Sequence, residues 1–153
     1  MPIVDKIFKK ETTNLKVKSI LTLMMYSGLH LHEIAFLRRE NVDLRRMSVK
    51  ITKPRERIIY FKHGTAKFAR RYFLKEPEKE YAFNITYRSL QNLFDKISNE
   101  IKDVKFNSIL LRHSYAVNYL KNGGNIDELF HLLGGTSIER YRKFDMHLPK
   151  EPV

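Results

Sequence analysis

Apolar side chains near the start of the chain recur with the period of an α-helix. Between residues 12 and 27 they fall at i, i+3, i+4 and i+7, at Val17, Ile20, Leu21 and Met24. Thr13 or Asn14 can cap this helix, and Gly28 is placed to end it. A shorter helix is predicted over residues 32–39.

The period changes to two after residue 46, which predicts strands. Apolar Met47, Val49 and Ile51 alternate with polar residues, and the turn-like sequence KPRE separates them from the apolar stretch RIIYF. This pattern predicts a β-hairpin. The sequence RRYFL at Arg70–Leu74 is a candidate third strand, so we expect a small antiparallel three-stranded sheet.

The second half of the chain returns to helical patterns. Helices are predicted over residues 86–101, from 107 to the Gly123–Gly124 pair, from 125 to the Gly134–Gly135 pair, and over 136–144. The last two open on the capping-box patterns Asn125-x-x-Glu128 and Thr136-x-x-Glu139. Because helices and strands are segregated, the predicted fold class is α+β, a mainly helical domain with a small sheet. Residues 1–153 contain no linker or repeat, so one domain is expected.

The positive charge of the chain is concentrated in one region. The formal net charge is +12, and residues 38–71 contain twelve Lys and Arg but three acidic residues. Such a cluster favours a polyanion, because each phosphate contact releases condensed counterions. A solvated face kept for solubility is the alternative, but mixed charges would suit that role better.

Several classes of protein are disfavoured. The chain has no Cys, which excludes a disulfide framework and a thiolate zinc site and agrees with a cytoplasmic setting. No apolar run approaches the ~18 residues of a membrane span. There is no amphipathic helix with a Lys-rich polar face, and the start lacks a signal-peptide core. No membrane partner is therefore expected.

The sequence GLHLHEIAFL, residues 28–37, places two histidines and a glutamate in an apolar stretch. His30 and His32, at i and i+2, would point to nearly opposite sides of a helix, and two ligands without a third make a poor zinc site. The chain has no His-Glu-x-x-His spacing and no Gly-x-Ser-x-Gly elbow. We therefore expect neither a metal nor a cofactor.

Three stretches resemble the catalytic domain of the tyrosine recombinase, or phage integrase, family. LTLMMYSGLHLHEIAFLRRENVDL is similar to its opening, where a helix ends in Thr-Gly-Leu-Arg and Glu-Leu-x-x-Leu follows. MSVKITKPRERIIYF resembles its β-hairpin with a basic turn, and LLRHSYAVNYLKNGGNIDELFHLLGG its Leu-Arg-His-x-x-Ala and Leu-Leu-Gly-His motifs. The resemblance spans about residues 16–145, and the matching positions are Gly28, Leu29, Glu33, Leu37, Val42, Asp43, Leu111, Arg112, His113, Ala116, Leu120, Gly123, Leu132, Leu133 and Gly134.

The resemblance implies a chemistry that this sequence carries only in part. Family members cleave DNA by attack of a tyrosine hydroxyl on a phosphodiester, without metal or cofactor. Two arginines bind the charged oxygens of the transition state, and a Lys or His protonates the leaving oxygen. At the six family positions, two arginines, one lysine, two histidines and the tyrosine, this chain has His30, Arg112, Lys53, Ile109, Gly135 and Phe144.

The changed positions predict a protein that binds DNA but does not cut it. Phe144 has no oxygen with which to attack, and Ile109 and Gly135 cannot donate a side-chain hydrogen bond. Losing one preorganised donor alone costs ~10²–10³ in rate. The chain is thus expected to act in, or regulate, recombination or integration of a mobile element. The N-terminal core-binding domain of the family is not expected in it.

Double-stranded DNA is the expected partner, and basic side chains supply the expected contacts. Arg112 can instead be a purely structural arginine, and Lys53 a solvated turn residue. Glu33 is expected to orient neighbouring basic groups. The residues predicted to contact DNA are Arg112, Lys53, Arg55, Arg57, His30 and Lys67.

Two alternatives stay open at this point. Tyr141 lies one helical turn before Phe144 and could be the nucleophile of a divergent active recombinase, with catalytic groups supplied by a partner. It can equally be a core aromatic, at i+3 from Ile138. The other alternative is a module that binds a recombinase protomer, or a second copy of itself, and little DNA.

Overall fold

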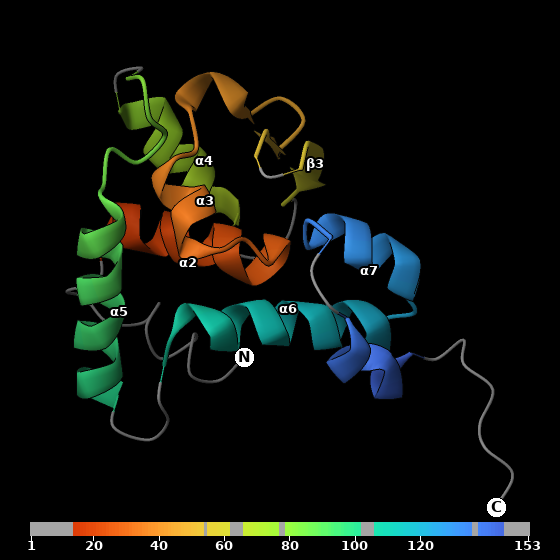
Figure 1. Ribbon diagram of the computed structural model, residues 1–153. Coiled ribbons are helices and arrows are strands. Elements are labelled where there is room, and N and C mark those ends of the chain that lie inside the picture. The colour runs from red at the N-terminus through yellow and green to blue at the C-terminus, as the bar shows by residue number, and fades with distance from the viewer. Residues whose placement is uncertain are drawn as a thin grey trace, which may run out of the picture.

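The structure is a computed structural model that describes residues 14–53, 55–61, 66–76, 79–101, 106–135 and 138–145. Figure 1 shows α2 in the middle of the molecule, with α6 along one side and α3 and α4 along the other. In chain order the elements are α2 (Leu15–Ser27), α3 (Leu31–Ala35), η1 (Arg39–Asn41), β1 (Val42–Asp43), β2 (Ser48–Ile51), β3 (Arg57–Tyr60), α4 (Ala66–Lys75), α5 (Tyr87–Ile101), α6 (Ser108–Lys121), α7 (Ile126–Leu132) and η2 (Glu139–Phe144).

Helix α2 forms for the reasons its sequence suggests. The Asn14 side chain accepts a hydrogen bond from the Val17 backbone N–H at 2.9 Å and so satisfies one of the free donors at the helix start. Gly28 ends the helix in the left-handed conformation, with φ of 66°. The predicted cap and end are both confirmed. Ile20, Leu21, Leu23 and Met24 are completely buried, which makes α2 the central helix of the core.

The α+β fold class and the antiparallel three-stranded sheet are confirmed, but one strand was predicted wrongly. The strand order is β1–β2–β3, and Val49 pairs with both Val42 and Ile59. The third strand is therefore β1, not residues 70–74, which lie within α4. The physical reason for the helix appears when the pattern is followed over all ten residues of α4. The buried residues of α4 are Ala66, Ala69, Tyr72 and Phe73, spaced as on one helix face.

The helices of the second half are confirmed, with one change. The Asn125 side chain caps α7 by accepting from the backbone N–H groups of Asp127 and Glu128. The last predicted helix is the 3₁₀-helix η2, which is shorter than residues 136–144. Thr136, its predicted cap, lies outside the described residues. No helix among the described residues is long and apolar enough to cross a membrane.

The buried apolar residues form two clusters that meet on α6. The larger one surrounds α2 and includes residues of the sheet, α4 and α5, and it reaches α6 at Leu111. The smaller one joins the later part of α6, from Ala116, to α7 and η2. Arg112 stands on α6 between these clusters. We call the polar contacts around it, made by Glu33, Arg57 and Arg112, the arginine junction.

Candidate functional site

His30 lies in the short link between α2 and α3. It is the residue before α3, with extended backbone (φ −76°, ψ 158°), and its N–H donates to Glu33 Oε1 at 3.0 Å. Burial of the ring, followed by the nearby Arg112 guanidinium, lowers the pKa of His30 to about 4. At neutral pH the side chain is therefore uncharged and offers one N–H donor rather than a forked cation.

The two histidines are arranged differently from the prediction. Their rings stack with centroids 5.2 Å apart, because His30 precedes the helix and does not follow its 100° rotation per residue. The expectation that they point to opposite sides was wrong. Stacked rings do not bring their nitrogens to one point. Among the described residues, no three side chains of the types that bind metals lie together.

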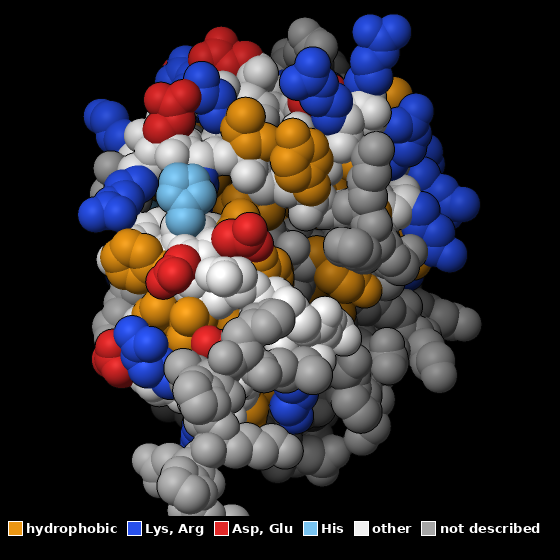
Figure 2. Space-filling view, turned by 90° about the vertical axis from the view of Figure 1, so that its right-hand side faces the viewer, with side chains coloured by type: hydrophobic (Ala, Val, Ile, Leu, Met, Phe, Trp, Pro, Cys, Tyr) orange, Lys and Arg blue, Asp and Glu red, His pale blue; other side chains and the backbone are white. Residues whose placement is uncertain are grey.

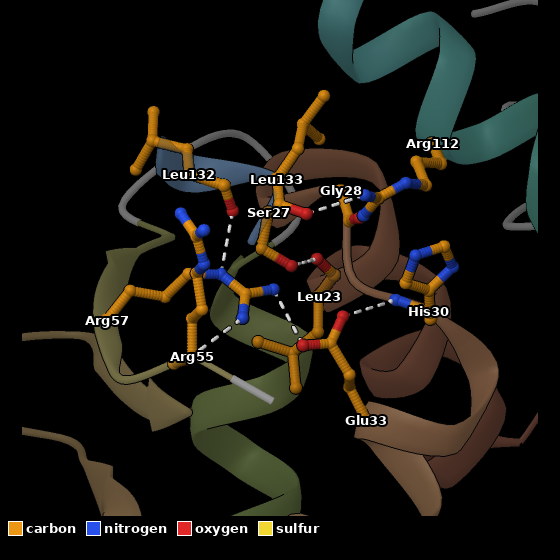
Figure 3. Close-up of polar contacts among 10 residues, drawn as sticks. All are labelled: Leu23, Ser27, Gly28, His30, Glu33, Arg55, Arg57, Arg112, Leu132 and Leu133. Atoms are coloured by element: carbon orange, nitrogen blue, oxygen red, sulfur yellow. Dashed lines mark hydrogen bonds and ion pairs between the residues drawn. The ribbon is translucent and has the colours of Figure 1, made fainter. Parts of the chain in front are cut away.

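Glu33 connects α3 to the sheet at the centre of the arginine junction. Its Oε2 accepts from Arg57 Nη2 at 2.6 Å, and both side chains are only 1% exposed. The carboxylate thus receives one charged donor from Arg57 and one backbone donor from His30 (Figure 3). A buried charge needs such partners, since a lone one would lose its hydration without compensation. Glu33 was expected to orient neighbouring basic groups, and it contacts one of them, Arg57.

Arg57 was predicted to contact DNA, and the structure places it inside the molecule. It is 3% exposed. Its Nε donates to Leu132 O at 2.8 Å and its Nη1 to Arg55 O at 3.4 Å, beside the Nη2 bond to Glu33. Leu132 O is in the last turn of α7, where carbonyls lack a partner within the helix. The sequence pattern does not reveal this burial, because it depends on buried acceptors from α3 and α7 that meet at β3.

Arg112 binds the ends of two helices. One Nη donates to Gly28 O, the residue that ends α2, and Nη2 donates to Leu133 O at the end of α7, at 2.7 Å. The residue is 8% exposed. Burial lowers the pKa of the guanidinium, and Glu33 opposes that change. Cations are favoured at helix C-termini by the unpaired carbonyls and the helix dipole. Arg112 therefore has a structural role in this structure, whatever further anion it meets.

The exposed cations lie beside the junction rather than in it. Lys53 and Arg55 are exposed at the turn between β2 and β3, and Lys67 is exposed on α4. Figure 2 shows the side of the molecule that carries β3 and α7, with Lys and Arg side chains at its top and along both edges. These three predicted contact residues are accessible, unlike Arg57 and Arg112.

A groove that the sequence did not indicate borders Lys53. It has a volume of about 350 Å³, and Phe36, which is 66% exposed, lies in its wall. Two further cations line it: Arg38, which pairs with Glu40 and Glu80, and Lys50, which pairs with Glu56 at 3.1 Å. The basic cluster of residues 38–71 contained these cations, but their common groove depends on the sheet.

The three other residues predicted to stand at family positions, Ile109, Gly135 and Phe144, have no polar side-chain atom. Ile109 is 65% exposed in the first turn of α6, and Gly135 follows α7 with φ of 79°. Phe144 is the last residue of η2, and Lys121 Nζ lies 5.6 Å from the centroid of its ring. Tyr141 is 5% exposed in the smaller apolar cluster, with its ring 5.1 Å from that of His113. The interpretation of Tyr141 as a core aromatic thus agrees with its burial.

Comparison with known proteins identifies the family to which the chain belongs. The model of the phage integrase family matches residues 3–148. The chain is 25% identical to the tyrosine recombinase XerA of Saccharolobus solfataricus over 127 residues, which cover 81% of this chain and 43% of that protein. The chain spans less than half the length of the curated relatives it matches.

Solved structures share the fold. The crystal structure of XerA recombinase superposes with a TM-score of 0.80 at 19% identity, covering 97% of this chain and 57% of that one. The Tn1549 transposon integrase in complex with a circular intermediate DNA gives 0.74 at 13% identity, covering 97% and 59%. Since the family model covers nearly all of the sequence, the chain belongs to the phage integrase family and has the fold of a tyrosine recombinase catalytic domain.

Proposed function

We propose that this chain binds double-stranded DNA without cutting it, and in this way takes part in or regulates recombination or integration. The observation that carries the proposal is Phe144 at the family's nucleophile position. The hydrocarbon ring has no lone pair and no proton to transfer, so it cannot form a bond to phosphorus. The fold of the family is kept while this essential group is absent.

The other positions assigned to the family's site also support the loss of cleavage. The transition state needs donors aimed at the phosphate oxygens. His30 is neutral at pH 7, and Ile109 and Gly135 have no polar side-chain atom. Arg112 keeps its place, but its guanidinium already donates to two carbonyls. A phosphate at this position would therefore meet far fewer charged donors than the reaction requires.

DNA binding, in contrast, needs none of the lost groups. Lys53, Arg55 and Lys67 are exposed and can each contact a phosphate. The net charge of +12 attracts a polyanion over longer distances. The Tn1549 integrase, which shares the fold, has been solved with DNA bound. Arg57 and Arg112 are buried beneath this surface, and their hydrogen bonds hold β3 and α7 in place.

One observation favours a second candidate function, a divergent active recombinase that uses Tyr141. Burial lowers the pKa of the Arg112 guanidinium, and Tyr141 is among the nearby groups that oppose this change, so a phosphate bound to Arg112 would not be remote from the Tyr141 hydroxyl. Its burial argues against attack, because in-line displacement tolerates little misplacement.

A nicked suicide duplex separates the two functions. The wild-type protein and the Tyr141→Phe variant are each incubated with the duplex, and the products are separated on an SDS gel. The proposal expects no covalent adduct with either protein. An adduct formed by wild type and lost in Tyr141→Phe would establish the second function. Binding that does not weaken with added salt would instead favour a module that contacts a recombinase protomer.

A further inference from the structure

Gly135 is in contact with the guanidinium of Arg55. A Cβ atom at Gly135 would lie 2.6 Å from Arg55 Nη1, 2.7 Å from Cζ and 2.9 Å from Nε. Carbon atoms do not approach other heavy atoms this closely without a clash. Gly135 also has φ of 79°, a conformation that disfavours any side chain. The Arg55 guanidinium thus occupies the space that a side chain at position 135 would need.

This position has a meaning in the chain's resemblance to its family. Gly135 stands where the Leu-Leu-Gly-His motif has its second histidine. A histidine at position 135 would need the space of this Cβ, which the Arg55 guanidinium fills. The two side chains therefore exclude each other in this arrangement. Arg55 reaches the same end of α7 from a different element, the β2–β3 turn (Figure 3).

The surroundings hold Arg55 in place but do not neutralise it. Its Cζ lies 5.7 Å from the centroid of the Phe130 ring on α7, within the range of a cation–π contact. The nearest acidic residue in sequence, Glu56, pairs with Lys50 instead. Among the described residues, no carboxylate and no hydrogen-bond acceptor is within bonding distance of the Arg55 guanidinium.

The carbonyls at the end of α7 are also occupied. Phe130 O accepts from Gly135 N at 2.8 Å, Leu132 O from Arg57 and Leu133 O from Arg112. Glu33 is paired with Arg57. Three guanidinium groups therefore meet at this helix end, and two of them have acceptors there. The third, on Arg55, has no acceptor among the described residues, so its N–H donors can bind an acceptor from outside the chain.

We propose that Arg55 binds a phosphodiester of the DNA backbone, in the space that Gly135 leaves by lacking a side chain. The planar fork of an arginine can donate two parallel hydrogen bonds to two phosphate oxygens. Phe130 and the Arg57–Arg55 backbone contact hold the group in position. This inference rests on the proposed DNA binding and names one residue that performs it.

The first test removes the charge of Arg55. Duplex affinity is measured against salt for wild type, Arg55→Gln and Arg88→Gln. Arg88 is an exposed arginine on α5, which Figure 1 places on the opposite side of the molecule from α7. Loss of one phosphate contact should reduce the slope of log K against log salt by about 0.9. It should also weaken binding roughly tenfold at low salt.

The outcomes distinguish this inference from the proposed function. A reduced slope in Arg55→Gln but not in Arg88→Gln supports the role of Arg55. A wild-type slope near zero would remove the proposed DNA binding altogether. A normal wild-type slope that Arg55→Gln leaves unchanged, or that both variants reduce equally, would overturn the inference alone.

The second test displaces the guanidinium and keeps its charge. Gly135→Ala places a methyl group against Arg55, whereas Gly123→Ala adds one at a similar φ, 89°, with no atom within 4 Å. Gly135→Ala should weaken duplex binding about as much as Arg55→Gln, and Gly123→Ala should not. In an Arg55→Gln background, Gly135→Ala should have no further effect. Equal effects of the two alanines would contradict the proposal, and if Gly135→Ala fails to fold the Arg55→Gln slope decides.

Discussion

Arg55 and Arg57 are two residues apart, and they lie in opposite surroundings. Arg57 is 3% exposed, and its guanidinium donates to a carboxylate and two carbonyls. Arg55 is exposed and rests on one aromatic ring. The difference comes from the available acceptors: Glu33 and the end of α7 satisfy one arginine, and no described acceptor remains for the other. Positive charge in a basic cluster is thus not equivalent to DNA-binding surface.

The same difference in burial separates two regions of the molecule. One is the buried arginine junction, and the other is the exposed turn with Lys53 and Arg55. Changes in the junction should reduce stability, because they leave a buried charge or carbonyl without a partner. Changes at the turn should reduce affinity for DNA and leave stability nearly unchanged.

The largest effect is expected from Glu33→Gln. This substitution leaves the Arg57 guanidinium buried without its counter-charge, so the free energy of unfolding should fall by about 3–5 kcal/mol. Urea unfolding measures it. Glu56→Gln, the same change in the exposed pair with Lys50, should cost at most about 1 kcal/mol. Equal losses in the two variants would show that the junction is no more important than a surface pair.

Arg112→Met should have the next largest effect. It removes the donors to Gly28 O and Leu133 O, so two buried carbonyls lose a partner and α7 loses its link to the end of α2. A loss of about 2–4 kcal/mol is expected. Arg140→Met, the same change at an exposed position, is the control. A stability equal to that of the control would mean that Arg112 is held for a ligand alone.

A smaller effect should appear in the pH dependence of stability. The pKa of His30 is lowered to about 4 in the folded protein, and an unfolded histidine titrates near 6.5. Between these values the unfolded chain binds more protons, so His30 stabilises the fold above about pH 6.5 and this contribution is lost as the pH falls towards 4.

The difference between wild type and His30→Gln isolates this contribution. Because the half-exposed ring is partly screened by water, wild type should lose about 1–2 kcal/mol more than His30→Gln between pH 7 and pH 4. Urea unfolding at the two pH values measures it. Parallel losses in both proteins would show that the His30 pKa is not lowered by folding.

The smallest effect on stability is expected at the turn. Lys53→Gln should change the free energy of unfolding by less than about 0.5 kcal/mol, since the side chain is exposed. Its effect should appear instead as a smaller salt dependence of duplex binding, by about 0.9 in slope. A substantial loss of stability would place Lys53 with the junction rather than with the surface.

Local patterns predicted the fold well wherever the signal was periodic and capped. The Asn14 cap, the Gly28 end and the three later α-helices all follow from spacing and cap chemistry. Helix α4 was missed, because a five-residue window of alternating character cannot be distinguished from one turn of an amphipathic helix.

The candidate site was harder to predict because it depends on contacts across long separations in sequence. The motifs assign His30, Arg112, Gly135 and Phe144 to family positions, and these assignments stay predictions. The burial of Arg57 depends on Glu33 and Leu132, and the contact between Arg55 and Gly135 joins a turn to a helix end 80 residues later. Neither is encoded in local periodicity.

The central claim, that this chain holds duplex DNA and leaves it intact, can be tested on one labelled, nicked suicide duplex. The same wild-type reaction is divided between a native gel and an SDS gel. The account predicts a shifted band in the native gel, weakened by added salt, and only free DNA in SDS. A protein-linked band that survives SDS would contradict the claim.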